Sequence, residues 1–398
     1  MSALRILVLL PHLPCPCRGG ADIRNWQNIR ALAEYGKVEV VGLLSPDKDY
    51  ATPDLEQRVT WHSFSGFRKG EGQLSGMQIL SRLRNLFTDY YYTDENIAAM
   101  KQILERFKPQ VAVVSHLVGY LFTGILKDAG CKVISDCHNV EGLLAGKIEV
   151  NEFIKDRRMI EYIKQNVGKV EKRLCLDADL VWVCSETDRE IIRPLYNLPG
   201  PVHVVPNTID VETYRNRTPV PQTILFPATF SYEPNRNAAE MLMEKIFPRV
   251  AENFPDAELW LPGKDPAPAM LAAATENRAV VVPGQVDDMR DYLSRAAVMA
   301  VPLYTAGGTR LKILEAFASR LAVVTTAEGA EGIDGREGEH LLLAEDEEQF
   351  TEKIGLLFID SVLRERLTQN AYRLVSQSYS STALMKVISG SLAELAIP

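Results

Sequence analysis

Short runs of β-branched and other apolar residues alternate with amphipathic stretches along the whole chain. Several runs are apolar at nearly every position, as expected for strands that helices cover on both faces. Their alternation with helical patterns is typical of βαβ units and parallel sheets. The runs predicted as strands are Ile6–Leu10, Val38–Leu44, Val111–Ser115, Lys132–Asp136, Leu180–Ser185, Val202–Asn207, Thr223–Thr229, Glu258–Gly263, Ala279–Gly284, Val298–Leu303, Ala322–Thr326 and His340–Ala344.

These runs fall into two groups, which predicts two Rossmann-like domains with a boundary near Pro206–Asp210 or Arg215–Gln222. A length of 398 residues agrees with two domains, since about 150 residues per domain is usual. Between Trp61 and Phe107 the pattern loosens, and we expect an insertion that carries helices. The stretch Ser376–Pro398 is periodic in apolar residues and predicts a terminal helix with no strand after it.

Composition narrows the class of protein. Apolar residues make up 46% and charged residues 24%, as in soluble globular proteins. The net charge of −8 argues against a nucleic-acid partner. Apolar runs are too short for a membrane span or a signal peptide, and six scattered cysteines are too few for a disulfide scaffold. We therefore expect a cytoplasmic protein with free thiols. Cys15-Pro16-Cys17 lacks a second cysteine pair at zinc spacing, which disfavours a metal site there.

Two glycines, Gly19 and Gly20, lie between the first strand and the predicted helix Trp26–Glu34. Glycines at this place let backbone amides approach a ligand, and a helix N-terminus favours an anion. The dinucleotide fingerprint G-x-G-x-x-G is absent, which disfavours NAD and FAD. A simple turn explains the two glycines equally well.

His138 follows the predicted strand Lys132–Asp136. A side chain just past the carboxyl end of a parallel strand faces the crevice where open α/β folds bind ligands. Neighbouring Asp136 and Glu141 are suited to orient its ring or to hold its charge. The alternative is a helix-capping Asp–His pair without chemistry. His116 ends another strand in the same way and is the weaker candidate.

The most informative segment follows the strand Val298–Leu303, breaks at two glycines and starts a helix that carries Arg310 and Lys312 in its first turn. Backbone amides, the helix dipole and two cations converge there, which suits a diphosphate. Glu315 lies one turn further, where a carboxylate can accept ribose hydroxyls. A second glycine turn, with Gly329 and Glu331, follows the next strand. Two ordinary loops with solvated charges are the alternative.

Residues 225–350 resemble the C-terminal domain of retaining glycosyltransferases of the GT-B fold, known as group 1 or family 4. The N-terminal half is similar more loosely, through the Gly19-Gly20 loop, Asp136–Glu141 and Ala178–Ser185. The C-terminal resemblance rests on Leu261–Lys264, Val282–Asp288, Ala300–Pro302, Gly308–Ala316, Thr325–Gly332 and Glu339–Leu343.

The resemblance implies an α/β protein of the GT-B fold, whose two parallel sheets face each other across a cleft. It assigns residues 1–207 to the acceptor side and residues 208–375 to the nucleotide sugar, and it lets the helix 376–398 cross back to the first domain. The implied activity is transfer of a hexose-type sugar, with retention, from a nucleotide diphosphate sugar (UDP or GDP). The implied acceptor is a glycan, a lipid-linked saccharide or a polysaccharide precursor, and neither cofactor nor metal is expected.

The chain departs from the family at two places. Gly307 stands where the family usually has a glutamate that touches the donor, and the usual Arg and Lys after the first strand of the C-terminal domain are missing from Ala228–Ala238. A subset with Gly-Gly-Thr-Arg-x-Lys is similar to this chain, and we infer that Arg310 and Lys312 bind the diphosphate there. The predicted catalytic residues are His138, Arg310 and Lys312. The predicted donor residues are Gly19, Gly20, Gly308, Thr309, Glu315, Gly329 and Glu331, and the predicted acceptor-side residues are Arg24, His116 and Asn139.

Two alternatives stay open at this point. A nucleotide-sugar epimerase or hydrolase would share the fold and the donor site, and a catalytically silent binding protein would lack turnover. A peripheral contact with the inner membrane face is a weaker hypothesis. It rests on basic residues at Arg82, Arg84, Lys155, Arg157, Arg158, Lys164, Lys169, Lys172 and Arg173, and a solvated face explains them equally well.

Overall fold

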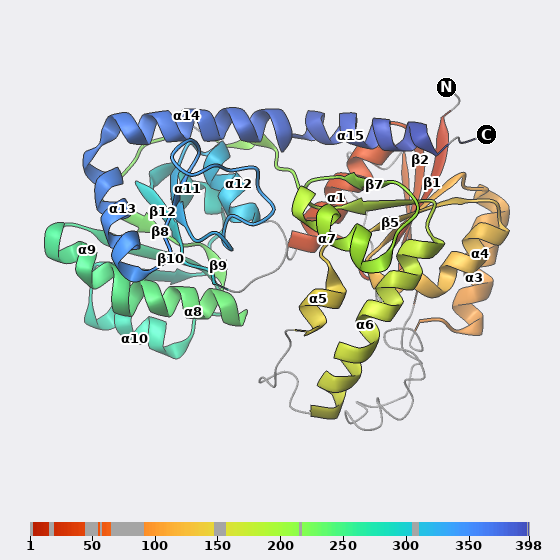
Figure 1. Cartoon of the computed structure of the whole chain (residues 1–398), viewed down its shortest axis with the longest axis horizontal. Coiled ribbons are helices and arrows are strands. Elements are labelled where there is room, and N and C mark those ends of the chain that lie inside the picture. Colours follow the sequence, from red (N-terminus) through yellow and green to blue (C-terminus); the bar gives the residue numbers. More distant parts are fainter. Residues whose placement is uncertain are drawn as a thin grey trace. The chain divides into compact units, whose positions relative to one another are not determined.

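The computed structural model describes residues 3–15, 20–43, 55, 58–64, 91–146, 157–214, 217–304, 310–395 and 397. By contacts the chain divides into two compact units. The first comprises Met1–Pro206 together with Leu384–Pro398, and the second comprises Asn207–Ala383. Each unit has one parallel sheet with helices packed on it (Figure 1). No helix in the described ranges is long and apolar enough to cross a membrane.

The sheet of the first unit has the strand order β3-β2-β1-β4-β5-β6-β7. The order reverses between β1 and β4, and the carboxyl ends of strands beside such a switch point are the usual ligand sites of open parallel sheets. The buried runs of β-branched residues form these strands, as the sequence predicts. Their bounds are β1 Leu4–Leu10, β2 Gly36–Gly42, β3 Val59–Ser63, β4 Val111–Ser115, β5 Lys132–Asp136, β6 Leu180–Val183 and β7 Val202–Val204.

Helices cover this sheet, and the last of them comes from the end of the chain. Leu384, Ile388 and Leu392 of that helix, α15, join the apolar cluster that includes Trp182. The indole N–H of Trp182 also donates to Ser391 Oγ at 3.2 Å. The helices of the first unit are α1 Gly20–Ala33, α3 Asp94–Phe107, η1 Leu117–Phe122, α4 Thr123–Asp128, α5 Glu141–Gly146, α6 Arg157–Asp177, α7 Glu186–Tyr196 and α15 Ser381–Glu394.

The stretch between Trp61 and Phe107 begins differently from the prediction. Its first residues belong to β3, which pairs with β2 at the edge of the sheet. The strand escaped notice because Thr60, His62 and Ser63 interrupt its apolar pattern, and edge strands tolerate polar positions. The end of the stretch forms the helix α3, and residues 65–90 lie outside the described ranges.

The second unit repeats the parallel architecture with the order β11-β10-β8-β12-β13-β14, and β9 pairs with β10. The strands are β8 Thr223–Leu225, β9 Ala228–Thr229, β10 Glu258–Lys264, β11 Val280–Gly284, β12 Val298–Val301, β13 Ala322–Thr325 and β14 Leu342–Leu343. The helices are η2 Val211–Thr213, α8 Glu233–Met241, η3 Leu242–Ile246, α9 Phe247–Asn253, α10 Pro268–Glu276, α11 Met289–Arg295, α12 Leu311–Ala318, α13 Glu347–Ile359 and α14 Ser361–Ser378. Two seven-stranded parallel sheets, one in each unit, confirm the predicted α/β fold with two Rossmann-like domains.

Candidate functional site

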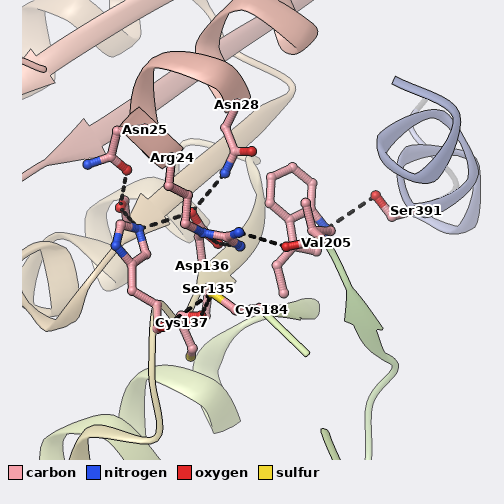
Figure 2. Close-up of polar contacts among 12 residues, drawn as sticks. Arg24, Asn25, Asn28, Ser135, Asp136, Cys137, Cys184, Val205 and Ser391 are labelled. Atoms are coloured by element: carbon pink, nitrogen blue, oxygen red, sulfur yellow. Dashed lines mark hydrogen bonds and ion pairs between the residues drawn. The ribbon is translucent and has the colours of Figure 1, made fainter. Parts of the chain in front are cut away.

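A buried ion pair lies at the carboxyl end of β5 in the first unit (Figure 2). Asp136 is the last residue of the strand, and its Oδ1 accepts from Nη2 and Nε of Arg24 at 2.5 and 3.2 Å. Asn28, one turn further along α1, donates to Oδ2 at 3.1 Å. Arg24 Nη1 also donates to the carbonyl of Val205 at 2.6 Å. The network therefore ties α1 to the ends of two strands.

Both charges of this pair are almost fully removed from water, with 2% of Arg24 and 1% of Asp136 exposed. Burial alone would raise the pKa of Asp136, but the charge of Arg24 and the hydrogen bonds of Arg24 and His138 hold it well below its usual range. Arg24 thus pairs with an internal carboxylate, which is a structural contact, and its place on the acceptor side stays a prediction.

His138, two residues past β5, is 6% exposed and contacts two groups through Nε2. Ser115 Oγ lies at 2.9 Å and Asp136 Oδ2 at 3.4 Å. The Ser115 hydroxyl donates its single proton to Asn25 Oδ1 at 2.7 Å, so we assign the proton to Nε2 of His138, which donates to Ser115. Nδ1 is buried and has no hydrogen-bond partner among the described residues. In the neutral ring this atom is an acceptor, and a buried acceptor without a partner indicates a ligand contact.

His116 directly follows β4 and lies beside His138, with the two ring centroids 4.7 Å apart. Its backbone has φ 64° and ψ 175°, a conformation that side chains other than hydrogen strongly disfavour. Burial lowers the pKa of His116 to about 3, so the ring is neutral at physiological pH. Asn139 donates to Glu141 Oε1 at 3.1 Å. The structure therefore places His116, His138 and Asn139 at one edge of the sheet, with His116 and Asn139 both close to Glu141.

A buried glutamate that sequence reasoning missed holds the loop after His138. Glu171 on α6 is fully buried and accepts from the backbone N–H groups of Glu141 and Gly142 at 2.8 and 2.9 Å. Tyr196 Oη donates to the same carboxylate at 2.6 Å. A side chain at Gly142 would overlap the Tyr196 hydroxyl, which explains the glycine. An acidic residue within the apolar face of α6 is the one signal in the sequence that points to Glu171.

The second unit places two cations at the start of α12, past the carboxyl end of β12. Arg310 is the N-cap residue and is 7% exposed. Lys312 Nζ donates to Asn235 Oδ1 at 3.2 Å and lies 4.2 Å from the centre of the Phe226 ring. Burial, and then the charge of Arg310, lower the pKa of Lys312 to about 7. Lys312 forms no ion pair with a carboxylate in the described ranges, and a bound anion would stabilise its charge.

Glu315 lies one helical turn beyond Lys312 and is half-buried. Burial raises its pKa, although the hydrogen bond from Tyr214 Oη (3.2 Å) and the charge of Lys312 oppose the rise. Arg310 Nη2 donates to the carbonyl of Glu328 at 3.3 Å, which ties the start of α12 to the turn after β13. A carboxylate and two cations thus lie on one short stretch of chain, as a nucleoside diphosphate requires.

The turn after β13 is compact at Gly329. Its N–H donates to Thr326 Oγ1 at 2.9 Å, and a Cβ at this position would overlap Thr325 Oγ1. Only glycine therefore fits here. Glu331 is exposed, and its charge acts on Arg310.

Of the predicted residues, Gly19, Gly308 and Thr309 lie outside the described ranges, and Gly20 is the first residue of α1. The structure places His116 beside His138 in the first unit and ties Arg310 to the turn that carries Gly329 and Glu331 in the second. Sequence reasoning missed Tyr214, Phe226 and Asn235, because they lie far from α12 in the sequence. No three His, Cys, Asp or Glu side chains group as a metal site within the described ranges.

Comparison with known proteins agrees with this arrangement. Residues 18–213 match the model of "Glycosyltransferase Family 4", and residues 221–360 match the model of "Glycosyl transferases group 1". No curated protein matches the chain.

Among solved structures, sucrose-phosphate synthase from Thermosynechococcus elongatus has a TM-score of 0.73 at 17% identity, covering 98% of this chain and 99% of that one. Anabaena Alr3699/HepE in complex with UDP and glucose has a TM-score of 0.66 at 14% identity, covering 98% and 99%. A mutant of S. aureus TarM in complex with Fondaparinux, alpha-GlcNAc-glycerol and UDP has a TM-score of 0.65 at 11% identity, covering 97% and 99%. At these identities the likeness establishes the shared fold.

Proposed function

We propose that this chain transfers a hexose-type sugar, with retention, to a saccharide or lipid-linked acceptor. Its two family domains and its fold identify it as a GT-B glycosyltransferase. The donor is a nucleotide diphosphate sugar, with UDP or GDP as the nucleotide. The observation that carries the proposal is the half-buried Lys312 in the first turn of α12, which forms no ion pair with a carboxylate in the described ranges and lies two residues from the buried Arg310.

The chemistry demands positive charge at one place. As the bond between the anomeric carbon and the β-phosphate oxygen breaks, negative charge grows on the departing nucleoside diphosphate. Fixed cations and helix amides stabilise that charge without reorganising, and more strongly in a buried site than in water. Arg310 and Lys312 are placed for this task, and we propose that they act without a divalent metal. Glu315 would accept the ribose hydroxyls, and Glu331 with the Gly329 turn would meet hydroxyls of the donor sugar.

In the first unit we assign the contact with the sugar to His138. Its Nδ1 is a buried acceptor without a described partner, which suits a donated sugar hydroxyl. Asp136 and Ser115 fix the opposite nitrogen and thereby the orientation of the ring. We propose that the acceptor binds on the side of His116 and Asn139.

The compared proteins support the choice of donor and acceptor. UDP occurs in the HepE and TarM complexes, and alpha-GlcNAc-glycerol and Fondaparinux occur with TarM. We accordingly propose a UDP-sugar donor before a GDP-sugar, and a role in polysaccharide biosynthesis in the cytoplasm. For a lipid-linked acceptor we propose a peripheral membrane contact through basic residues of α6; Arg82, Arg84 and Lys155 lie outside the described ranges.

Turnover assays test the proposal. The full chain would be incubated with UDP- and GDP-sugars, a panel of saccharide and lipid-linked acceptors, and EDTA, while release of the nucleotide is followed. We expect release that depends on an acceptor, persists with EDTA, and gives a product with the anomeric configuration of the donor by NMR. Release of free sugar at full rate without an acceptor would contradict transfer, and an inverted product would contradict retention.

A further inference from the structure

A cavity of about 570 Å³ lies in the second unit, away from the proposed donor site. Gln222 and Ala297, which line it, directly precede β8 and β12, so the cavity lies at the amino ends of these strands. Arg310 and Lys312 lie past the carboxyl end of β12. The cavity and the donor site are therefore at opposite edges of the same sheet.

Three arginines line this cavity, Arg217, Arg320 and Arg364, and Glu365 is the single acidic residue of its lining. We refer to it as the arginine pocket. None of the three guanidinium groups forms an ion pair with a carboxylate in the described part of the chain. The lining therefore carries a positive surplus. Arg320 is exposed, whereas Arg217 and Arg364 are half-buried, where a charge without a counterion is costly.

Hydrogen bonds to backbone carbonyls use only some of the donors. Arg217 donates to the carbonyls of Arg320 (2.9 Å) and Ala296, which lie at the ends of α12 and α11. Arg364 donates through Nη1 alone, to Leu357 and Phe358. Cations are favoured at helix C-termini, so these contacts have a structural role. They leave Nε and Nη2 of Arg364 without a described partner.

Arg320 has no such structural role. Its guanidinium lies over the Tyr372 ring, 3.7 Å from the ring centre, and donates to no described group. This stacking leaves all five N–H donors in the plane of the guanidinium for a ligand. The electrostatics agree, because burial and then the charge of Arg364 lower the pKa of Arg217 to about 10. Arg364 thus disfavours the charge of Arg217, and an anion between the two would relieve this repulsion.

We infer that the arginine pocket binds a small phosphate ester, such as a sugar phosphate. A guanidinium group can bind two phosphate oxygens at once through two parallel hydrogen bonds, and this pocket has more than one guanidinium group. Phe358, Tyr372, Pro219 and Pro221 supply apolar and aromatic walls for the organic part of the ligand. The volume falls within the range of pockets that hold small molecules. The site is distinct from the donor site and does not depend on its assignment.

Two structural links connect this ligand with the donor site. Tyr214 lines the arginine pocket, and its hydroxyl donates to Glu315 at 3.2 Å. The helix α12 carries Lys312 in its first turn and Ala318, another residue of the pocket lining, at its end. A phosphate ester that shifts Tyr214 or the end of α12 therefore changes the affinity for the nucleotide, and linkage requires the reverse effect of equal size.

Calorimetric titration of the full chain with glucose 6-phosphate, in the presence and absence of saturating UDP, tests the inference. We expect saturable binding that persists with UDP, that Lys312→Gln retains, and that exceeds the affinity for inorganic phosphate. Arg320→Gln, which removes no described hydrogen bond, should weaken it about tenfold, as for a lost bond to a charged group. Arg366→Gln, on α14 close to Arg364 in sequence but outside the pocket lining, is the control for the loss of one arginine of this unit and should bind as wild type.

Several outcomes of these titrations would contradict a phosphate-ester site in the arginine pocket. Absence of heat for the phosphate ester, competition by UDP, or unchanged affinity in Arg320→Gln would each contradict a site in the arginine pocket. Equal affinity for glucose 6-phosphate and inorganic phosphate would contradict the assignment to an ester. Circular dichroism and the melting temperature of Arg320→Gln establish that the variant is folded.

Discussion

The hydroxyl of Tyr214 donates a hydrogen bond of 3.2 Å to Oε1 of Glu315. Tyr214 follows η2 at the start of the second unit, whereas Glu315 belongs to α12, about a hundred residues later. The bond fixes the orientation of the half-buried Glu315 carboxylate, whose pKa partial burial raises. Because Tyr214 also lines the arginine pocket, it is the residue shared by both proposed sites of this unit.

Tyr214→Phe removes this bond alone and keeps the ring. We expect the affinity for UDP to fall about fivefold, as for one net hydrogen bond of about 1 kcal/mol, because the carboxylate is then less well oriented and more readily protonated. Calorimetric titration measures the change. A UDP analogue without ribose hydroxyls is the control, and its affinity should be the same for both proteins. An equal loss for the analogue would show that Tyr214 does not act through the ribose contact of Glu315.

The affinity for UDP should depend on pH through Lys312. Its pKa in the free protein is about 7, and a bound diphosphate favours the protonated form. Binding therefore takes up a proton above pH 7, and the affinity should fall about fivefold between pH 7 and pH 8. Titrations in buffers of different ionisation enthalpy measure the proton uptake. In Lys312→Gln the dependence should disappear over this range, and a persistent dependence would assign it to another group.

Asp136→Asn should destabilise the first unit strongly. Removal of the carboxylate leaves the buried charge of Arg24 without its partner, which costs about 3–5 kcal/mol in comparable cases. Because the native pKa of Asp136 is depressed, its contribution is complete above the unfolded pKa of about 4 and is lost as the pH falls below it. Urea unfolding should show the difference from wild type at pH 7 and a smaller one at pH 3.

An exposed ion pair of the same unit is the matched control for this experiment. Glu34 and Arg58 form a bond of 2.9 Å with 52% and 54% of their side chains exposed. Glu34→Gln should therefore change the free energy of unfolding by less than about 1 kcal/mol. If Asp136→Asn cost no more than this control, the buried pair would not stabilise the fold as described.

Much of the fold is predictable from the sequence, because strands buried on both faces are apolar at nearly every position. Lys132–Asp136 and Val111–Ser115 were predicted with the bounds that the structure gives. The edge strand β3 was missed, since its polar residues break the pattern that burial imposes. Asp288 caps α11 by accepting from the backbone N–H of Arg290, a role for which aspartate at a helix start is the usual signal.

Only some residues of the candidate site are predictable from the sequence. Residues next to glycine turns and strand ends, such as Lys312 and His138, carry a local signal that sequence reasoning detects. Their partners do not, because Asn235, Tyr214 and Glu171 approach only through tertiary packing. Arg24 shows the limit most clearly. Nothing in its neighbourhood along the chain indicates that its partner is Asp136, 112 residues away.

The strained backbone of His116 gives a further prediction. With φ 64° and ψ 175°, the residue occupies a region that glycine adopts freely and that costs other residues about 1–3 kcal/mol. His116→Gly should therefore be more stable than His116→Ala, by about 1 kcal/mol after the entropy of glycine is allowed for. Thermal unfolding measures both variants. The order should be reversed at Gly390, where Gly390→Ala meets no atom within 4 Å and removes a glycine from a helix.

The central claim is that Arg310 and Lys312 bind the diphosphate of a nucleotide sugar without a metal. Titration of the wild type and of Lys312→Gln with UDP in the presence of EDTA tests this claim most directly. Lys245→Gln, which replaces an exposed lysine of the same unit paired with Glu347, is the control. We predict binding to the wild type and to the control, and a loss of about tenfold or more in Lys312→Gln. Equal affinities of Lys312→Gln and wild type, or binding that EDTA abolishes, would contradict the claim.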